Sequence, residues 1–187
     1  MPFDFKKEYK EFYLPKNEPE IVTVPRANYI AVRGTGDPNE ENGAYQRAIG
    51  VLYAVAYTLK MSRRAGYEID GARKSDFRWI SVLRLPDFIT KADFDWAAET
   101  AAKKKKLDCS AAEFLTVDEG LCVQIMHLGS FDSEGESVAK MDEFLRANGY
   151  ENDLCDARWH HEIYLFDPRR VAADRRKTVI RHPVRKA

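Results

Sequence analysis

Apolar residues recur in three segments of the chain at the spacing of an amphipathic helix. The three segments are residues 38–59, 90–106 and 133–149. A capping residue stands at or just before the start of each, namely Asp37, Thr90 and Ser133, and Gly149 is a stop signal after the third. The pattern therefore predicts three helices, each with one face that packs against other elements.

Five further segments are rich in β-branched and aromatic residues, as strands are. They are residues 22–32, 77–85, 121–129, 159–166 and 177–181. Two of the turns that follow these segments share a pattern, Gly34-Thr35-Gly36-Asp37 and Gly129-Ser130-Phe131-Asp132. The order of elements fits either a duplication, with halves at about 18–87 and 113–184 joined by a helix at 90–106, or two unrelated strand–helix–strand units.

Both alternatives are an α+β fold in a single domain that spans residues 1–187. In the duplicated version, two β-α-β-β halves related by pseudo-two-fold symmetry combine their antiparallel strands into one sheet system. Helices then cover one face, and the other face forms a groove between the halves. Such a groove is a usual place for a ligand, so we expect a binding site there.

Charge is balanced over the whole chain but not along it. The 187 residues are 44% hydrophobic, and 30 Lys and Arg face 30 Asp and Glu. A zero net charge argues against a dedicated nucleic-acid or membrane-surface protein, because no overall positive field attracts phosphates. Residues 169–187 nonetheless hold eight Lys or Arg against Asp174 alone, and residues 132–153 are acidic. We expect this basic tail to be solvated and to pair with the acidic segment; the alternative is a phosphate-binding arm.

The three cysteines, Cys109, Cys122 and Cys155, are widely spaced and include no CxxC pair. This set argues against a disulfide framework and against a zinc site, and we expect Cys109 and Cys122 in the core. No apolar run reaches the length of a signal-peptide core or of a membrane span. The sequence therefore predicts a cytoplasmic protein with reduced thiols.

The segment RWHHEIYLFDP, residues 158–168, carries the most informative chemistry. On a strand, side chains alternate, so we expect His161 and Ile163 to pack under helices and Glu162 and Tyr164 to face the groove. A carboxylate beside a phenol could hold a lipophilic cation or, when desolvated, act as a general acid or base. The alternative is an exposed sheet face with ordinary polar residues.

A metal site is the less favoured interpretation of the same segment. Only His160 and Glu162 share a strand face there, and His127 is the remaining candidate for a third ligand before His182 in the tail. The sequence also contains no G-x-S-x-G nucleophile motif and no phosphate-binding G-x-x-x-x-G-K-[ST] loop. We therefore expect neither a metal nor a cofactor.

Several aromatic residues near the ends of the groove strands are candidates for ligand contacts, and a histidine joins them. The candidates are Tyr45, Tyr53, Trp79, Trp96, Phe131 and His127. Taken singly, each aromatic side chain is equally typical of a core. Their placement near both ends of the proposed groove strands is what favours a binding role, and it indicates a small aromatic molecule as the partner.

Motifs from one end of the chain to the other occur in a distinctive order. They are KEYKEFYLPK at 7–16, GTGDPN at 34–39, EGLCVQ at 119–124 and HHEIYL at 160–165. In this order they resemble the stand-alone GyrI-like small-molecule-binding family. The resemblance implies a duplicated β-α-β-β fold in which a glutamate at the base of an aromatic-lined groove meets drug-like and often cationic compounds, and Glu162 is the matching residue.

The resemblance implies more than one function. A similar subfamily hydrolyses cyclopropane-bearing DNA-alkylating natural products in an aromatic cage, so one hypothesis is a hydrolase in which Glu162 activates water and Tyr164 donates a hydrogen bond. A second is xenobiotic binding without turnover. A third is sequestration of a protein such as a topoisomerase. The oligomeric state is not predicted.

Overall fold

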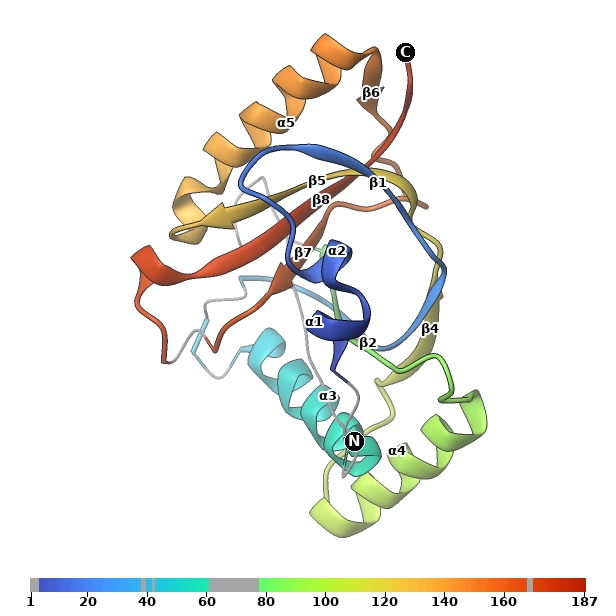
Figure 1. Cartoon of the computed structure of the whole chain (residues 1–187). Helices are drawn as coiled ribbons and strands as arrows, with labels where there is room; N and C mark the ends of the chain where they lie inside the picture. Colours follow the sequence, from blue (N-terminus) through green and yellow to red (C-terminus); the bar gives the residue numbers. More distant parts are fainter. Residues whose placement is uncertain (1–3, 38–39, 42, 61–77, 168–169) are drawn as a thin grey trace. The chain divides into compact units, whose positions relative to one another are not determined.

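The computed structural model describes residues 4–37, 40–41, 43–60, 78–167 and 170–187 (Figure 1). The chain divides into two compact units, one made of residues 27–117 and the other of residues 4–26 together with 118–187. Each unit has its own antiparallel sheet and its own helices. The predicted α+β class is therefore confirmed, whereas the internal duplication stays a prediction.

The first unit is a three-stranded sheet with two helices. Its strands are β2 (Ala27–Thr35), β3 (Arg78–Arg84) and β4 (Glu113–Val117), in the order β3-β2-β4, and its helices are α3 (Ala44–Lys60) and α4 (Lys91–Lys105). Residues from both helices and from the sheet form one buried cluster, in which Ile30, Leu52, Val55 and Leu83 are almost completely inaccessible. The apolar stripe of α3 therefore packs as the sequence predicts.

The sequence predicts the start of α4 better than the start of α3. Thr90 and Asp93 form the expected capping box at the start of α4, with reciprocal bonds between side chain and backbone. By contrast, α3 begins at Ala44, well after the predicted cap at Asp37, and Pro38 lies outside the described residues. The described helix therefore starts later than the capping signal predicts.

The second unit is built on a sheet of five strands. They are β1 (Glu20–Val24), β5 (Gly120–Leu128), β6 (Tyr150–Asn152), β7 (His161–Tyr164) and β8 (Lys177–Lys186). The order is β1-β5-β8-β6, and β7 also pairs with β8. Because β1 pairs with β5, residues 20–24 join this sheet, although the sequence assigns them to the first half.

Helical elements lie on both sides of this sheet. They are α1 (Phe5–Glu8), α2 (Lys10–Tyr13) and α5 (Glu134–Asn148), together with the short 3-10 turns η2 (Phe131–Ser133) and η3 (Ala173–Arg175). As predicted, α5 ends at Gly149, which takes the left-handed conformation with φ of 70°. At its start, Ser133 makes no side-chain cap bond, so only the C-terminal signal acts as expected.

The basic tail is a central strand and not a solvated arm. Residues Lys177–Lys186 form β8, which pairs with β5 on one side and with β7 and β6 on the other. The predicted pairing with the acidic segment is confirmed at Arg185, which binds Glu151 at 2.7 Å and Asp153 at 2.8 Å. Arg181 is different, since it is only 2% exposed.

Strand register fixes which residues share a face of this sheet. Glu162 lies opposite Ile180, which lies opposite Ile125, so the three side chains are on one face. Ile125 and Ile180 pack against Met141 and Leu145 of α5. The α5 helix therefore packs on the sheet face that carries Glu162, against residues of β5 and β8, whereas the alternation along β7 alone predicted a face without helices.

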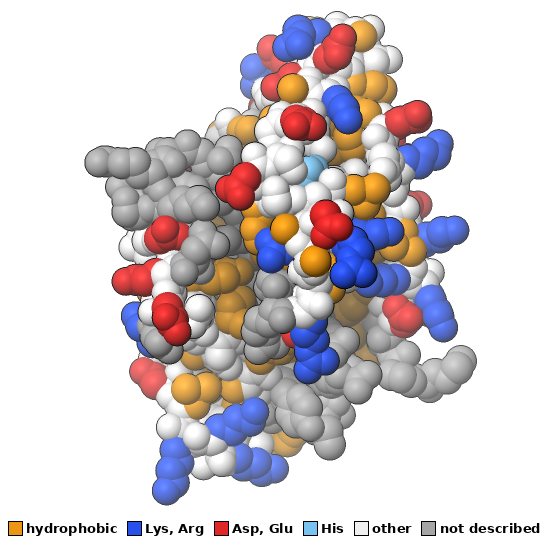
Figure 2. Space-filling view, turned by 90° about the vertical axis from the view of Figure 1, so that its left-hand side faces the viewer, with side chains coloured by type: hydrophobic (Ala, Val, Ile, Leu, Met, Phe, Trp, Pro, Cys, Tyr) orange, Lys and Arg blue, Asp and Glu red, His pale blue; other side chains and the backbone are white. Residues whose placement is uncertain are grey.

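Surface and cysteine properties agree with the composition. Lys and Arg are interspersed with Asp and Glu over the face shown in Figure 2, without a field of one sign. In the described part of the chain, no helix is long and apolar enough to cross a membrane. Cys109 and Cys122 are buried, as predicted, and Cys155 is exposed; all three are free thiols.

Candidate functional site

Glu162 on β7 is a buried carboxylate at the start of a row of histidines. Its side chain is 4% exposed, and its Oε1 lies 2.9 Å from Nε2 of His160. The Nδ1 atom of His160 lies in turn 2.6 Å from Nε2 of His182 on β8. Burial of a carboxylate requires polar partners, and the imidazole of His160 is one.

The heavy-atom geometry of this row is compatible with two proton arrangements. With Glu162 ionised and His160 neutral, Nε2–H of His160 donates to Glu162, and Nδ1 of His160 then accepts from His182. If His160 carries both protons, it donates to Glu162 and to His182 instead. The row can therefore take up one proton without moving an atom, which is what a group that exchanges protons with a ligand or water requires.

Three aromatic rings cluster around Tyr164, which shares the sheet face of Glu162. Tyr164 is two residues along β7, and its ring centroid is 5.2 Å from that of Phe131 and 5.8 Å from that of Phe166. Phe131 and Phe166 are 6.0 Å apart. All three rings are half-buried. We call Phe131, Tyr164 and Phe166 the aromatic cluster; its spacings are those of favourable ring pairs.

A turn after β5 holds Phe131 in this cluster. Gly129 has φ of 142°, which favours glycine, and a Cβ atom there would lie 2.9 Å from Oγ of Ser133. His127 is buried, with Nδ1 at 3.0 Å from Oγ of Ser137 on α5 and Nε2 at 3.0 Å from the carbonyl oxygen of Ser130. His127 thus supports the turn that carries Phe131, whereas the sequence suggested a ligand contact for it.

On the opposite face, Glu119, His161 and Arg181 form a buried charge cluster. Arg181 binds both carboxylate oxygens of Glu119 at 3.0 Å, and Nδ1 of His161 lies 2.8 Å from Oε2 of Glu119. Arg181 also donates to Oε1 of Gln124 and to the carbonyl oxygen of Phe12 in α2. The buried charge cluster therefore joins β7, β8, β5 and the N-terminal helices.

The surroundings of the buried charge cluster fix its protonation at neutral pH. Burial by itself would raise the pKa of Glu119, but Arg181 and then His161 lower this pKa to about 2. Burial, together with the charges of Arg181 and His160, lowers the pKa of His161 although Glu119 raises it, so His161 is neutral and donates Nδ1–H to Glu119. Burial also raises the pKa of Cys122 to about 12, so this thiol is not a nucleophile.

We expect acid to destabilise the protein in two stages. A lowered histidine pKa gives stability that is complete above its ordinary value of 6.5 and declines as the pH falls below it. The lowered pKa of Glu119 gives stability that is complete above 4.5 and is lost as the pH falls towards about 2. The melting temperature of the native protein should therefore fall between pH 7 and pH 5, roughly the range in which His161 takes up a proton. The melting temperature of the His161→Gln variant should fall less steeply over the same range. An equal slope for this variant would contradict the assignment to His161.

The remaining sequence candidates lie in the first unit. Trp79 is buried and meets Tyr45 edge-on at 5.2 Å within the core of that unit. Tyr53 and Trp96 are exposed by 49% and 57% on α3 and α4. The structure thus brings Glu162, Tyr164 and Phe131 together in the second unit, while their association with these four residues stays a prediction.

Sequence reasoning missed His182 as the neighbour of His160. The predicted last strand ended at residue 181, before Pro183, and proline is uncommon inside a central strand. In the structure β8 continues through Pro183, and His182 therefore keeps the alternation that places it beside His160. The alternation within RWHHEIYLFDP also predicts Phe166 on the face of Glu162 and Tyr164, although the sequence alone did not single it out as a ligand contact.

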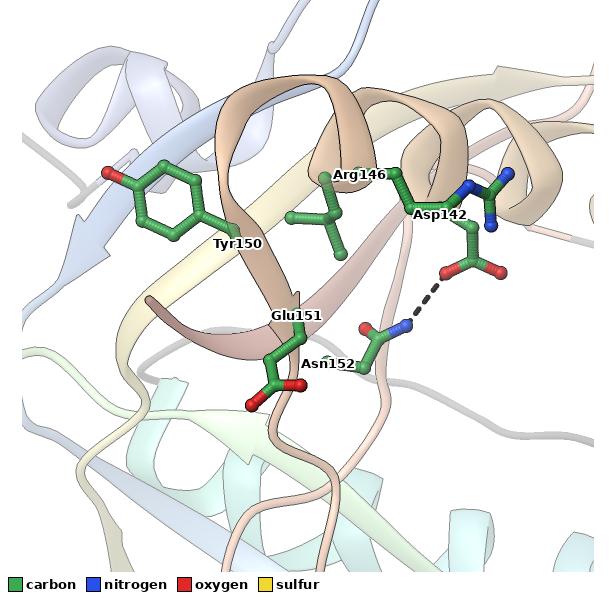
Figure 3. Close-up of a pocket in the computed structure, with 6 residues that line it drawn as sticks. Asp142, Arg146, Tyr150, Glu151 and Asn152 are labelled. Carbon is green, nitrogen blue, oxygen red and sulfur yellow. Dashed lines mark hydrogen bonds between the residues drawn. The ribbon is translucent and has the colours of Figure 1, made fainter. Parts of the chain in front are cut away.

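A surface pocket between the end of α5 and β6 is separate from these residues. It has a volume of about 150 Å³ and is lined by Asp142, Leu145, Arg146, Tyr150, Glu151 and Asn152 (Figure 3). Asn152 donates a hydrogen bond to Asp142 across it at 2.7 Å. None of the sequence candidates lines this pocket. Within the described ranges, no group of three His, Cys, Asp or Glu side chains is arranged to hold a metal ion.

Comparisons with known proteins agree with this architecture. The family model of the GyrI-like small molecule binding domain matches residues 17–185. Two crystal structures of Listeria innocua proteins, one a hydrolase and one an uncharacterized conserved protein, are each 40% identical to this chain. Each match covers 98% of this chain and 100% of the other, with a TM-score of 0.89.

The fold also extends to a much more distant protein. The C-terminal domain of EcmrR is 12% identical, with 91% of this chain and 98% of that domain covered and a TM-score of 0.62. At this identity the likeness shows the fold alone. Among curated proteins, the search finds no match.

Proposed function

We propose that this chain, which belongs to the GyrI-like small molecule binding domain family, binds planar aromatic molecules against the aromatic cluster beside Glu162. The observation that carries the proposal is a buried carboxylate that shares a sheet face with Tyr164, around which two more half-buried rings cluster. Rings supply stacking area, and the carboxylate accepts a proton donor or attracts a positive charge on the ligand.

Replacing Phe131 by Leu should weaken aromatic binding. The change removes two ring contacts, at 5.2 Å to Tyr164 and 6.0 Å to Phe166, while it keeps an apolar side chain. Since a ring pair contributes about 0.5–1.5 kcal/mol beyond area burial, we expect an affinity loss of about threefold to tenfold. Fluorescence anisotropy with 2-anthracenemethanol measures it.

Phe88→Leu is the matched control for this experiment. Phe88 is 69% exposed in the first unit and is not part of the aromatic cluster, so the same chemical change there should leave the affinity unchanged. Equal affinity of the Phe131→Leu variant and the native protein would remove the aromatic cluster from the binding site.

Hydrolysis is a second candidate function, and the 40% identical hydrolase from Listeria innocua favours it. Glu162 would take a proton from water as the water oxygen bonds to a carbon of an activated cyclopropane. The strained carbon–carbon bond breaks, and its electron pair moves to a conjugated carbonyl, whose oxygen becomes a phenolate. Return of the proton to that oxygen completes the addition of one water. Tyr164 would donate a hydrogen bond to the same oxygen.

A further inference from the structure

Arg176 differs from the arginines of the second unit that form ion pairs. Arg158, Arg181 and Arg185 each bind a carboxylate of this unit. The side chain of Arg176 is half-buried, and no carboxylate within the described part of the chain forms an ion pair with it. Its Nε atom is buried and has no acceptor among the described residues. A guanidinium has five N–H donors, so donor capacity remains for a ligand.

The guanidinium of Arg176 lies directly on the aromatic cluster. Its central carbon is 5.0 Å from the ring centroid of Phe131 and 5.7 Å from that of Phe166. These distances are those of cation–π contacts, which hold a guanidinium in place while leaving its edge available for an acceptor. Arg176 is also fixed by its backbone, because its carbonyl oxygen accepts a hydrogen bond from Gly129 at 3.2 Å.

The end of the aromatic cluster at Arg176 has a positive charge, whereas the end at Glu162 has a carboxylate. Thr178, opposite Tyr164 in the register and 1% exposed, has a hydroxyl group without a partner among the described residues. Glu162 precedes Tyr164 on the same strand face by two residues, about 7 Å, while Arg176 contacts Phe131 and Phe166 on the side of the later residues. The rings therefore have an acceptor of protons at one end and a fixed cation at the other.

We propose that Arg176 binds an oxygen of the ligand, so that the site takes planar aromatic molecules bearing a carboxylate, phenolate or conjugated carbonyl oxygen. The proposal rests on the aromatic binding proposed above and names the ligand class for it. It also gives Glu162 a role complementary to that of Arg176: the carboxylate meets a donor or water at the opposite end of the ligand. A purely cationic ligand would meet repulsion from Arg176.

The test compares two probes of the same ring system, 2-anthracenecarboxylate and 2-anthracenemethanol, by fluorescence anisotropy. We expect native protein to bind the carboxylate about tenfold more tightly, the effect of one charge-assisted hydrogen bond at a half-buried site. Arg176→Gln should remove this preference and leave the affinity for the alcohol within about twofold, since the ring contacts remain. Arg175→Gln, at the exposed neighbouring position, is the control and should keep the preference.

The outcomes separate this inference from the binding proposal beneath it. A preference for the carboxylate that survives in the Arg176→Gln variant overturns the role of Arg176, and so does equal binding of the two probes by native protein; aromatic binding stands in both cases. If native protein binds neither probe, both proposals fall. A melting temperature of Arg176→Gln close to that of Arg175→Gln shows that a lost preference does not come from unfolding.

Discussion

Replacing Glu162 by Gln will lower the hydrolysis of an activated cyclopropane by about 10²–10⁴-fold, the usual contribution of a positioned general base. The amide keeps the size of the carboxylate and can still accept from Nε2 of His160, but it cannot take a proton from water. The measurement is mass detection of a product one water heavier after incubation with a cyclopropyl-dienone substrate.

Controls for this variant follow from the structure. Glu136→Gln makes the same chemical change at an exposed position on α5 and should retain the native rate. An undiminished rate of Glu162→Gln would remove Glu162 from catalysis. If the native protein itself does not exceed the rate in buffer, hydrolysis is excluded for this substrate, while the binding proposal is decided separately by the anthracene titrations.

The sequence predicts most of the elements because their signals are local. The apolar stripe of α3, the capping box at Thr90 and the stop at Gly149 each depend on residues within one or two turns of helix. Glu162 and Tyr164 could be placed on one strand face for the same reason, since alternation along β7 needs no knowledge of the neighbouring strands.

What the sequence does not predict depends on partners far along the chain. The side of the sheet on which α5 packs is decided by Ile125 and Ile180 on β5 and β8, and no pattern within residues 159–166 shows it. The partnership of His160 with His182 likewise depends on the register of β7 against β8. A charge count treats Arg181 and Arg185 alike, although one is buried and the other exposed.

Arg181 should be the residue of the basic tail on which stability depends most. Arg181→Met leaves Glu119 buried at 9% exposure without its bidentate partner. It also removes the N–H groups that donate to Oε1 of Gln124 and to the carbonyl oxygen of Phe12. Because removing one member of a buried ion pair leaves an uncompensated charge, we expect the free energy of unfolding to fall by about 3–5 kcal/mol, as measured by urea denaturation.

Arg185→Met is the matched control, since Arg185 stands on the same strand and also binds two carboxylates, Glu151 and Asp153. Its side chain is 59% exposed, and an exposed ion pair gains little over hydration, so its loss should change the denaturation midpoint far less. The double variant Glu119→Gln/Arg181→Met should recover part of the stability lost in Arg181→Met, because no buried charge is then left without a partner. Equal losses of unfolding free energy for Arg181→Met and Arg185→Met would mean that burial of the Arg181–Glu119 pair adds nothing to its effect on stability. Strand β8 would then be held by backbone hydrogen bonds and apolar contacts alone.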